Sequence, residues 1–161
     1  MLDNEVLALA KKVNDRLLVC NKTIATAESC TGGLLAGALT SVPGSSGILY
    51  GGFVTYANAA KTEMIGVPDA VITRHGAVSP VVARMMAEGA LRRAGTDLAI
   101  STTGIAGPGG ATDEKPIGLV HFGLAMDGRT IHREMRYGDL GRAKIREESV
   151  RTALEMILEV L

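Results

Sequence analysis

The chain has 161 residues, of which 47% are hydrophobic and only 3% aromatic. Lysine plus arginine and aspartate plus glutamate number 17 each, so the formal net charge is zero. This balance, with so few aromatic side chains, excludes a general nucleic-acid binder, which would carry a basic excess or stacking platforms. The length and the apolar fraction are typical of one domain, residues 1–161, with its own hydrophobic core.

The N-terminal residues and the cysteines indicate a cytoplasmic protein. Residues 1–5 lack a basic segment, and no long apolar run follows them, so we expect neither a secretory signal nor a membrane span. Cys20 and Cys30 lie at no metal-ligand spacing, and a chain with this much apolar core does not need a disulfide framework. We therefore expect no metal and no cofactor.

Helices and strands alternate in the first two thirds of the chain. The apolar spacing predicts helices at residues 3–19, 34–39, 58–64 and 80–94, and strands at residues 23–27, 48–56 and 97–102. Thr31 or a neighbouring residue is the expected cap of the second helix, and Asn58 that of the third. Ser79 followed by Pro80 marks the start of the fourth helix, and Gly95 marks its end.

A hairpin and a helix complete the chain. The runs 119–126 and 130–137 flank Asp127-Gly128, a dipeptide that favours a tight turn between two strands. Residues 142–161 then carry a stripe of apolar side chains at helical spacing. Strands that first alternate with helices and later form a hairpin predict an α/β fold, with a mixed sheet that helices cover on both faces.

The junction from the first strand to the second helix is the first candidate site. It reads Ser29-Cys30-Thr31-Gly32-Gly33. Backbone N–H groups at a helix start lack partners and attract anionic oxygen, so a Ser29 hydroxyl there can act as a nucleophile with those groups as oxyanion donors. Cys30 is the rival nucleophile, because thiolates at helix N-termini are activated. A plain helix cap with glycines in a tight turn explains the same residues equally well.

A serine nucleophile needs a base, and the histidines are poorly placed for this role. His121 and His132 fall inside the hairpin strands, and His75 falls at a helix end. Lys61 is the alternative, because an ammonium group shielded from water loses its charge near neutral pH. It lies five residues after Tyr56, so both side chains reach the same sheet edge. A solvated surface lysine is, however, the commoner case.

Two later segments suit a ligand that carries a phosphate. The glycines of residues 104–110, which follow Thr103, permit close approach of the backbone, although this loop has neither the Walker A nor the dinucleotide pattern. Arg142 near the start of the last helix can bind a phosphate with its planar guanidinium. A flexible surface loop and an exposed, ion-paired arginine are the alternatives.

Taken together, these segments resemble the C-terminal domain of the CinA family, whose stand-alone members include nicotinamide mononucleotide deamidases of the PncC type. The likeness extends from about residue 5 to the end of the chain. The segments that match the family are, in chain order, Ala27–Gly33, Gly51–Tyr56, Asn58–Lys61, His75–Ser79 and Thr103–Gly110. Five matching segments in one order are far more specific than any one of them.

The resemblance implies a three-layer α/β/α sandwich, a homodimer, and an amidohydrolase that needs neither metal nor cofactor. The implied reaction converts nicotinamide mononucleotide and water to nicotinate mononucleotide and ammonia. By the same likeness Ser29 is the nucleophile, Lys61 its base and Tyr56 a hydrogen-bonding helper. The implied substrate-binding residues are Cys30, Thr31, Gly32, Gly33, Thr103, Gly104 and Arg142.

One departure from the family pattern affects the phosphate ligand. Leu140 and Gly141 intervene between Asp139 and Arg142, which leaves Arg146, one helical turn later, as the alternative. A non-catalytic nucleotide-binding or regulatory module, and a hydrolase of another small amide, remain as alternative functions because they would use the same residues.

Overall fold

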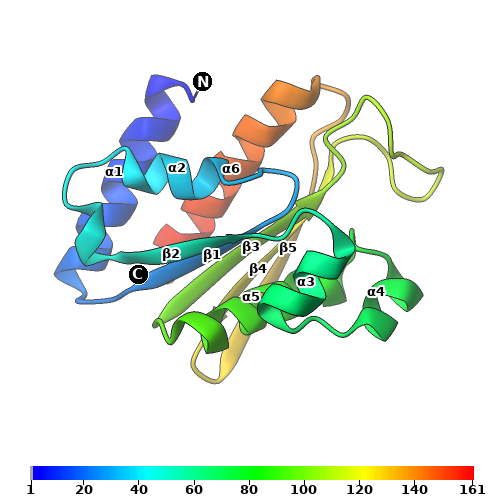
Figure 1. The fold of residues 1–161 in the computed structure, drawn as a ribbon. Coiled ribbons are helices and arrows are strands. Elements are labelled where there is room, and N and C mark those ends of the chain that lie inside the picture. The colour runs from blue at the N-terminus through cyan, green and yellow to red at the C-terminus, as the bar shows by residue number, and fades with distance from the viewer. Residues whose placement is uncertain (1) are drawn as a thin grey trace.

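A five-stranded mixed sheet forms the centre of the computed structural model, which describes residues 2–161 (Figure 1). Met1, the first residue of the predicted domain, lies outside the described residues. The strand bounds are β1 Ile24–Glu28, β2 Leu49–Val54, β3 Leu98–Gly104, β4 Leu119–Met126 and β5 Arg129–Arg136. The order across the sheet is β2-β1-β3-β4-β5, with β2, β1 and β3 parallel and the β4–β5 hairpin antiparallel. The predicted mixed sheet with a late hairpin is confirmed.

Helices cover both faces of this sheet (Figure 1). The helices on one face are α1 (Asn4–Val19), α2 (Leu34–Thr40) and α6 (Arg142–Glu159), and those on the other are α3 (Asn58–Ile65), α4 (Asp69–His75) and α5 (Pro80–Ala94). A short 3-10 turn, η1 (Ser45–Gly47), precedes β2. Each face has its own cluster of buried apolar side chains. The fold is therefore the expected three-layer α/β/α sandwich.

The ends of α5 follow the predicted local signals. The Ser79 hydroxyl accepts a hydrogen bond from the backbone N–H of Val82, Pro80 is the first helical residue, and Gly95 ends the helix with a left-handed φ of 65°. Proline loses no hydrogen bond at this first position, and glycine adopts a positive φ without steric cost.

The predicted cap of α3 is wrong, and that of α2 falls on a neighbour of Thr31. The residue before α3 is Ala57, so Asn58 is already helical. The N-cap of α2 is Gly33, and Thr31 does not cap this helix. The Thr31 hydroxyl instead donates to the carboxylate of Glu28. The same carboxylate accepts hydrogen bonds from the N–H groups of Leu35 and Ala36 in the first turn of α2. A carboxylate from the end of β1 thus replaces the hydroxyl cap that the sequence suggested.

The carboxyl ends of the three parallel strands meet at one end of the sheet. In open α/β sheets ligands bind outside these ends, where neighbouring strands connect to helices on opposite faces. Here β1 leads to α2 on one face, and β2 leads to α3 on the other. The topology therefore brings together the segments that follow β1, β2 and β3.

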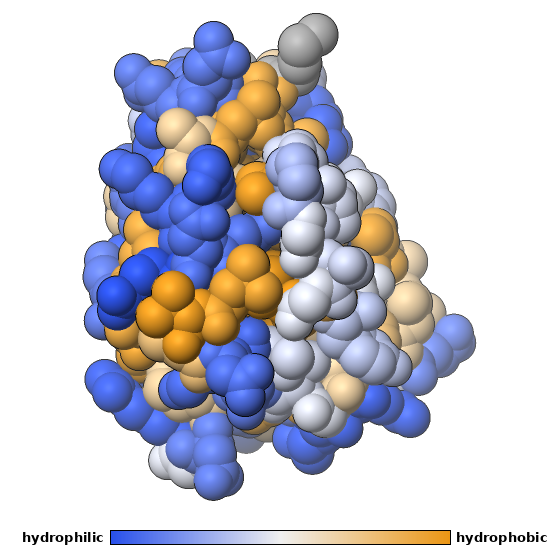
Figure 2. Space-filling model, turned by 90° about the vertical axis from the view of Figure 1, so that its left-hand side faces the viewer, coloured by the Kyte–Doolittle hydropathy of each residue, from blue (hydrophilic) through white to orange (hydrophobic). Residues whose placement is uncertain are grey.

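Exposed hydrophobic side chains gather mainly around one strand. On the side of the molecule at the left of Figure 1, hydrophobic areas are interrupted by hydrophilic ones (Figure 2). The large hydrophobic residues exposed within residues 2–161 are Leu18, Val19, Tyr50, Val54, Tyr56, Met64 and Leu140. Three of these belong to β2 or follow its end directly, so the edge strand carries the main apolar exposure. No helix in residues 2–161 has the length and apolarity to cross a membrane.

Candidate active site

A pocket of about 230 Å³ lies at the carboxyl ends of β1, β2 and β3. The residues that line it are Ser29, Cys30, Tyr56, Asn58, Lys61, Ala77, Val78, Thr103, Gly104, Ala106 and Arg142. All three implied catalytic residues are among them, as are four of the implied binding residues. The remaining three, Thr31, Gly32 and Gly33, are not part of the wall. The structure thus brings together residues from five separate segments of the chain.

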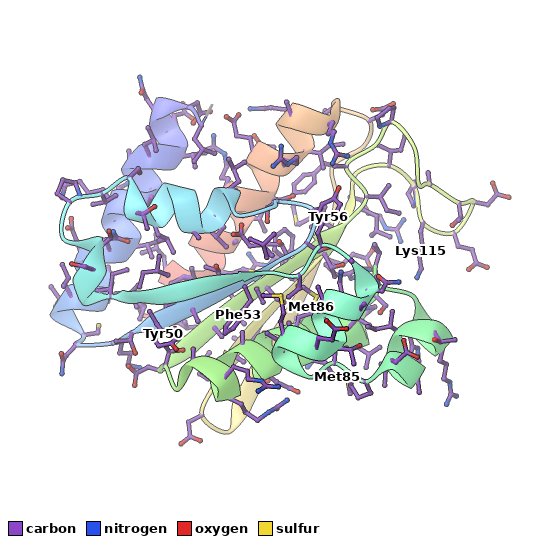
Figure 3. All side chains as sticks on the ribbon, in the orientation of Figure 1. Tyr50, Phe53, Tyr56, Met85, Met86 and Lys115 are labelled. Carbon is purple, nitrogen blue, oxygen red and sulfur yellow. The ribbon has the colours of Figure 1, made fainter. Side chains whose placement is uncertain are left out.

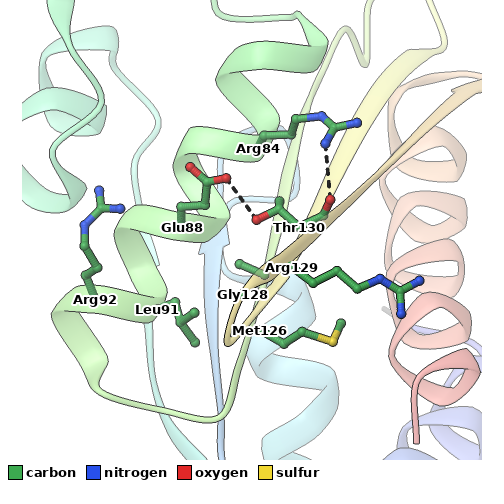
Figure 4. A pocket seen from close by; sticks show the side chains of 9 residues that line it. Arg84, Glu88, Leu91, Arg92, Met126, Gly128, Arg129 and Thr130 are labelled. Atoms are coloured by element: carbon green, nitrogen blue, oxygen red, sulfur yellow. Dashed lines mark hydrogen bonds between the residues drawn. The ribbon is translucent and has the colours of Figure 1, made fainter.

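A larger hollow, of about 480 Å³, lies between α5 and the turn of the β4–β5 hairpin (Figure 4). Arg84 and Glu88 there both bond Thr130, through its carbonyl and its hydroxyl respectively. The side chains of Arg92 and Arg129 extend in opposite directions (Figure 4). Because its polar groups do not converge, this hollow lacks the arrangement that binding sites share. The smaller pocket is therefore the candidate site.

Lys61 is fully buried, and its amine meets the Ser29 hydroxyl. The Lys61 Nζ donates to Ser29 Oγ at 3.1 Å and to the carbonyls of Thr55 at 2.7 Å and Tyr56 at 3.2 Å. No ion pair within residues 2–161 involves this lysine. A buried ammonium without a carboxylate partner is costly, so the neutral amine is favoured.

Burial lowers the pKa of Lys61 from 10.5 to about 8. At pH 7 about one tenth of the molecules then carry the neutral amine, against fewer than about one in a thousand for a solvated lysine. A neutral Nζ accepts a hydrogen bond through its lone pair, so it can take the proton of Ser29 Oγ. The pair has the geometry and the proton affinity of a nucleophile with its base.

Cys30, the rival nucleophile, is disfavoured by its surroundings. Its side chain packs in the core on the α1, α2 and α6 face, and burial raises the pKa of the thiol to about 12. The thiol therefore stays protonated near neutral pH, which leaves it a weak nucleophile. The expected activation at a helix N-terminus is outweighed by loss of solvent, a factor that local spacing does not reveal.

The turn after β1 depends on two glycines with positive φ. Gly32 has φ 58° and Gly33 has φ 97°, values that side chains with a Cβ rarely adopt. The N–H of Gly32 donates to the carbonyl of Ser29 at 3.0 Å, so it is already engaged and does not serve as an oxyanion donor in this state. The N–H of Thr31 has no hydrogen-bond acceptor within residues 2–161. The N–H of Cys30 likewise bonds no other residue within residues 2–161, so the N–H groups of Cys30 and Thr31 are both available as donors beside Ser29.

Glu28, which the sequence analysis did not single out, holds this turn from within. The carboxylate is fully buried and accepts bonds from the Thr31 hydroxyl at 2.8 Å, Leu35 N at 2.6 Å and Ala36 N at 3.3 Å. Burial raises the pKa of Glu28, and these donors oppose the increase. The residue therefore fixes the start of α2 relative to the end of β1.

The two arginines of α6 considered as phosphate ligands have different surroundings. Arg142 lines the pocket, and its guanidinium donates to the carbonyl of Gly107 and to the hydroxyl of Tyr56, both at 2.9 Å. Arg146 instead donates to the carbonyls of Cys30 and Thr31 and is not itself one of the lining residues. Of the two, Arg142 is the one placed to bind a phosphate in the pocket. The Tyr56 hydroxyl accepts a bond from Arg142, and the Tyr56 carbonyl accepts one from Lys61.

Thr103 and Gly104 end β3 and form one wall of the site. The Thr103 hydroxyl donates to the carbonyl of Ala77 at 2.8 Å, which ties β3 to the segment before α5. A Cβ on Gly104 would lie 2.6 Å from a methyl group of Val120 and 2.8 Å from the carbonyl of Leu119. This position requires glycine because β4 packs directly against it.

The histidines lie outside the pocket, as predicted. His121 and His132 stack within the β4–β5 hairpin with 2.9 Å between Nδ1 of the former and Nε2 of the latter. His75 is the last residue of α4. Within residues 2–161 no group of three or more His, Cys, Asp or Glu side chains is arranged to hold a metal ion.

Comparison with known proteins assigns the family. Residues 6–161 match the sequence model of the CinA C-terminal domain. The chain belongs to this family. It is 51% identical over 145 residues to a CinA-like protein of Mycobacterium marinum, covering 89% of this chain and 34% of that protein. It is 47% identical over 159 residues to a CinA-like protein of Akkermansia muciniphila, and this match covers 96% of this chain and 38% of that protein. The chain thus spans about a third of the length of the curated relatives that it matches.

Solved structures agree with this CinA assignment. A competence/damage inducible protein from Agrobacterium tumefaciens has a TM-score of 0.97 and 48% identity, covering 99% of this chain and 98% of that one. A CinA superfamily protein from Escherichia coli has a TM-score of 0.93 and 34% identity, covering 100% and 94%. The α/β fold of the CinA domain is therefore shared by both.

A change of Lys61 to Met tests the burial of the amine through stability. Between pH 8 and 10.5 the unfolded chain binds more protons at Lys61 than the folded chain, so the free energy of unfolding rises with pH in this window. The wild type should gain roughly 3 kcal/mol relative to Lys61→Met across it. Denaturant unfolding of both proteins at a series of pH values measures this difference. A difference that stays constant with pH would contradict the burial.

Proposed function

We propose that this chain is an amidohydrolase that converts nicotinamide mononucleotide and water to nicotinate mononucleotide and ammonia, with residues 1–161 acting as one catalytic domain. The observation that supports it best is the 3.1 Å contact between the buried Lys61 amine and Ser29 Oγ, in a pocket that Arg142 lines. An alcohol activated by a neutral amine suits attack on an amide carbon. The arginine suits the phosphate of a mononucleotide.

In the first half of the reaction, neutral Lys61 takes the proton from Ser29 as Oγ attacks the carboxamide carbon. The amide oxygen gains negative charge, and the free N–H of Thr31 is the donor proposed to stabilise it. Lys61 then passes its proton to the amide nitrogen, the carbon–nitrogen bond breaks, and ammonia leaves. The product of this half is an ester between Ser29 and the nicotinoyl group.

In the second half, water takes the place of the serine. Lys61, neutral again, accepts a proton from water as the water oxygen attacks the ester carbon. The bond to Oγ breaks, Ser29 recovers a proton from Lys61, and nicotinate mononucleotide is released. The phosphate held by Arg142 lies away from the reacting carbon, so its binding energy orients the amide. Thr103 and Gly104 border the same space, and the Tyr56 hydroxyl orients Arg142.

Release of ammonia from nicotinamide mononucleotide tests this function. The purified chain should release ammonia, and Lys61→Ala should lower turnover by at least about a hundredfold because the base is lost. Ser29→Ala should lower it at least as much. Cys30→Ala is the matched control and should keep most of the activity.

Two results would reject the proposal. Full activity in Ser29→Ala with none in Cys30→Ala would move the chemistry to the thiol. Tight binding of the nucleotide without ammonia release would indicate a non-catalytic module. A panel of other pyridine nucleotides and small amides, assayed in the same way, separates this substrate from another amide.

We also propose that the chain forms a homodimer through the exposed edge of β2. Residues 48–57 contain neither a charged residue nor proline, and Tyr50 and Val54 are 65% and 45% exposed. Tyr50 and Phe53 lie along β2 with Tyr56 just beyond its end (Figure 3). The opposite edge, β5, carries Arg129, Arg133, Glu134 and Arg136. Charges protect an open edge from pairing, so the uncharged edge is the one suited to a second copy.

A lysine at Tyr50 tests this interface. The wild type should sediment as a dimer, and Tyr50→Lys should sediment as a monomer because a charge would be buried at the edge. Leu18→Lys places the same charge at another exposed apolar position, 49% exposed on α1, and should remain dimeric. A monomeric wild type, or a dimer that Tyr50→Lys leaves intact, would exclude the β2 edge.

A further inference from the structure

Arg146 links α6 to the turn that carries Ser29. Its Nε donates to the carbonyl of Cys30 at 3.1 Å and its Nη2 to the carbonyl of Thr31 at 3.0 Å. These partners lie 116 and 115 residues away in the chain, so the contact is purely tertiary. A planar guanidinium presents two N–H groups in a fixed geometry, which a lysine ammonium does not reproduce.

These two bonds determine where the N–H groups of the turn point. In a trans peptide the carbonyl and the following N–H lie on opposite sides, and the turn has no cis bond. With the carbonyls of Cys30 and Thr31 held toward α6, the N–H groups of Thr31 and Gly32 point away from it. The Gly32 N–H closes the turn onto the Ser29 carbonyl at 3.0 Å. The Thr31 N–H is thereby left free two residues from Ser29, beside the free N–H of Cys30.

The charge of Arg146 also acts on the same peptide groups. A cation bonded to a carbonyl oxygen polarises the peptide, which strengthens the N–H at its other end as a donor. From the opposite direction the buried Glu28 carboxylate bonds the Thr31 hydroxyl and the first N–H groups of α2. The turn is therefore held by one buried anion and one cation.

We propose that Arg146 is a positioning residue for Ser29, which acts by orienting the Thr31 N–H toward the developing oxyanion. The inference rests on the proposed acyl transfer to Ser29, although not on the identity of the amide. It separates Arg146 from Arg142, one turn earlier on α6, which contacts Tyr56 and Gly107 and lines the pocket. Arg146 affects the rate of the chemical step, whereas Arg142 affects binding.

Steady-state kinetics with nicotinamide mononucleotide separate the two roles. Arg146→Lys should lower kcat by about tenfold to a hundredfold, approaching the loss of an oxyanion donor, with little change in KM. Arg142→Lys should mainly raise KM. Arg151→Lys is the matched control, because it alters an α6 guanidinium that pairs with Asp3 and Glu5 far from the turn, and it should match the wild type. A rise in KM alone for Arg146→Lys would overturn the positioning role.

Labelling of Ser29 by phenylmethanesulfonyl fluoride gives a readout that does not depend on the substrate. Ser29 Oγ attacks the sulfur and displaces fluoride, and the hydroxyl proton leaves with the fluoride. The sulfonylated protein is then detected by intact-protein mass spectrometry. Arg146→Lys should label at least about tenfold more slowly than the wild type and Arg151→Lys. Arg146→Gln, which keeps one N–H donor without the charge, serves as a second variant should the first unfold, and should also label slowly.

The two assays distinguish the possible failures. If the wild type releases no ammonia while the labelling contrast holds, the proposed substrate is wrong and the positioning role stands. If both Arg146 variants label at the rate of the wild type, the positioning role is wrong whatever the substrate.

Discussion

The desolvation of one amine governs the arrangement of this site. Lys61 is fully buried, its partners are a hydroxyl and two carbonyls, and no carboxylate of residues 2–161 pairs with it. Loss of solvent disfavours the charged form, and the amine becomes a base that is partly neutral near physiological pH. The same burial acts oppositely on Cys30, since it raises the pKa of the thiol and keeps it protonated. Burial thus favours the alcohol and the amine as a reactive pair, and it disfavours the thiol beside them.

The parallel strands bring the parts of the site together. β1 ends at the turn that carries Ser29. The residues that follow β2 supply the two carbonyls that accept hydrogen bonds from Lys61, and Thr103 at the end of β3 forms one wall of the pocket. The turn itself is stabilised by groups outside it, the carboxylate of Glu28 and the guanidinium of Arg146. A nucleophile on rigid elements with a firm supporting shell loses little entropy on reaching the reactive geometry.

Features with local signals could be predicted from the sequence. The Ser79-Pro80 start and Gly95 end of α5 and the Asp127-Gly128 hairpin each depend on a few neighbouring residues, and all are found. Burial and long-range contacts leave no such signal: the strand order, the role of Arg146 and the protonated thiol of Cys30 depend on segments distant in the chain. The partners of Glu28 are close in sequence, but its burial and its bonds to α2 follow no standard capping pattern. The spacing from Tyr56 suggested Lys61 as a base but did not distinguish it from a solvated surface lysine; the family resemblance, rather than spacing, favoured the first interpretation.

A nuclear magnetic resonance titration of the Lys61 side chain tests whether its amine is shielded from water beside Ser29. With carbon-13 at Cε, and Lys61→Arg used to assign the signal, the chemical shift follows the protonation of Nζ. We expect a midpoint near pH 8, well below the 10.5 of a solvated lysine. A midpoint at 10.5 would mean that the amine is hydrated and charged at neutral pH, and would contradict its role as the base.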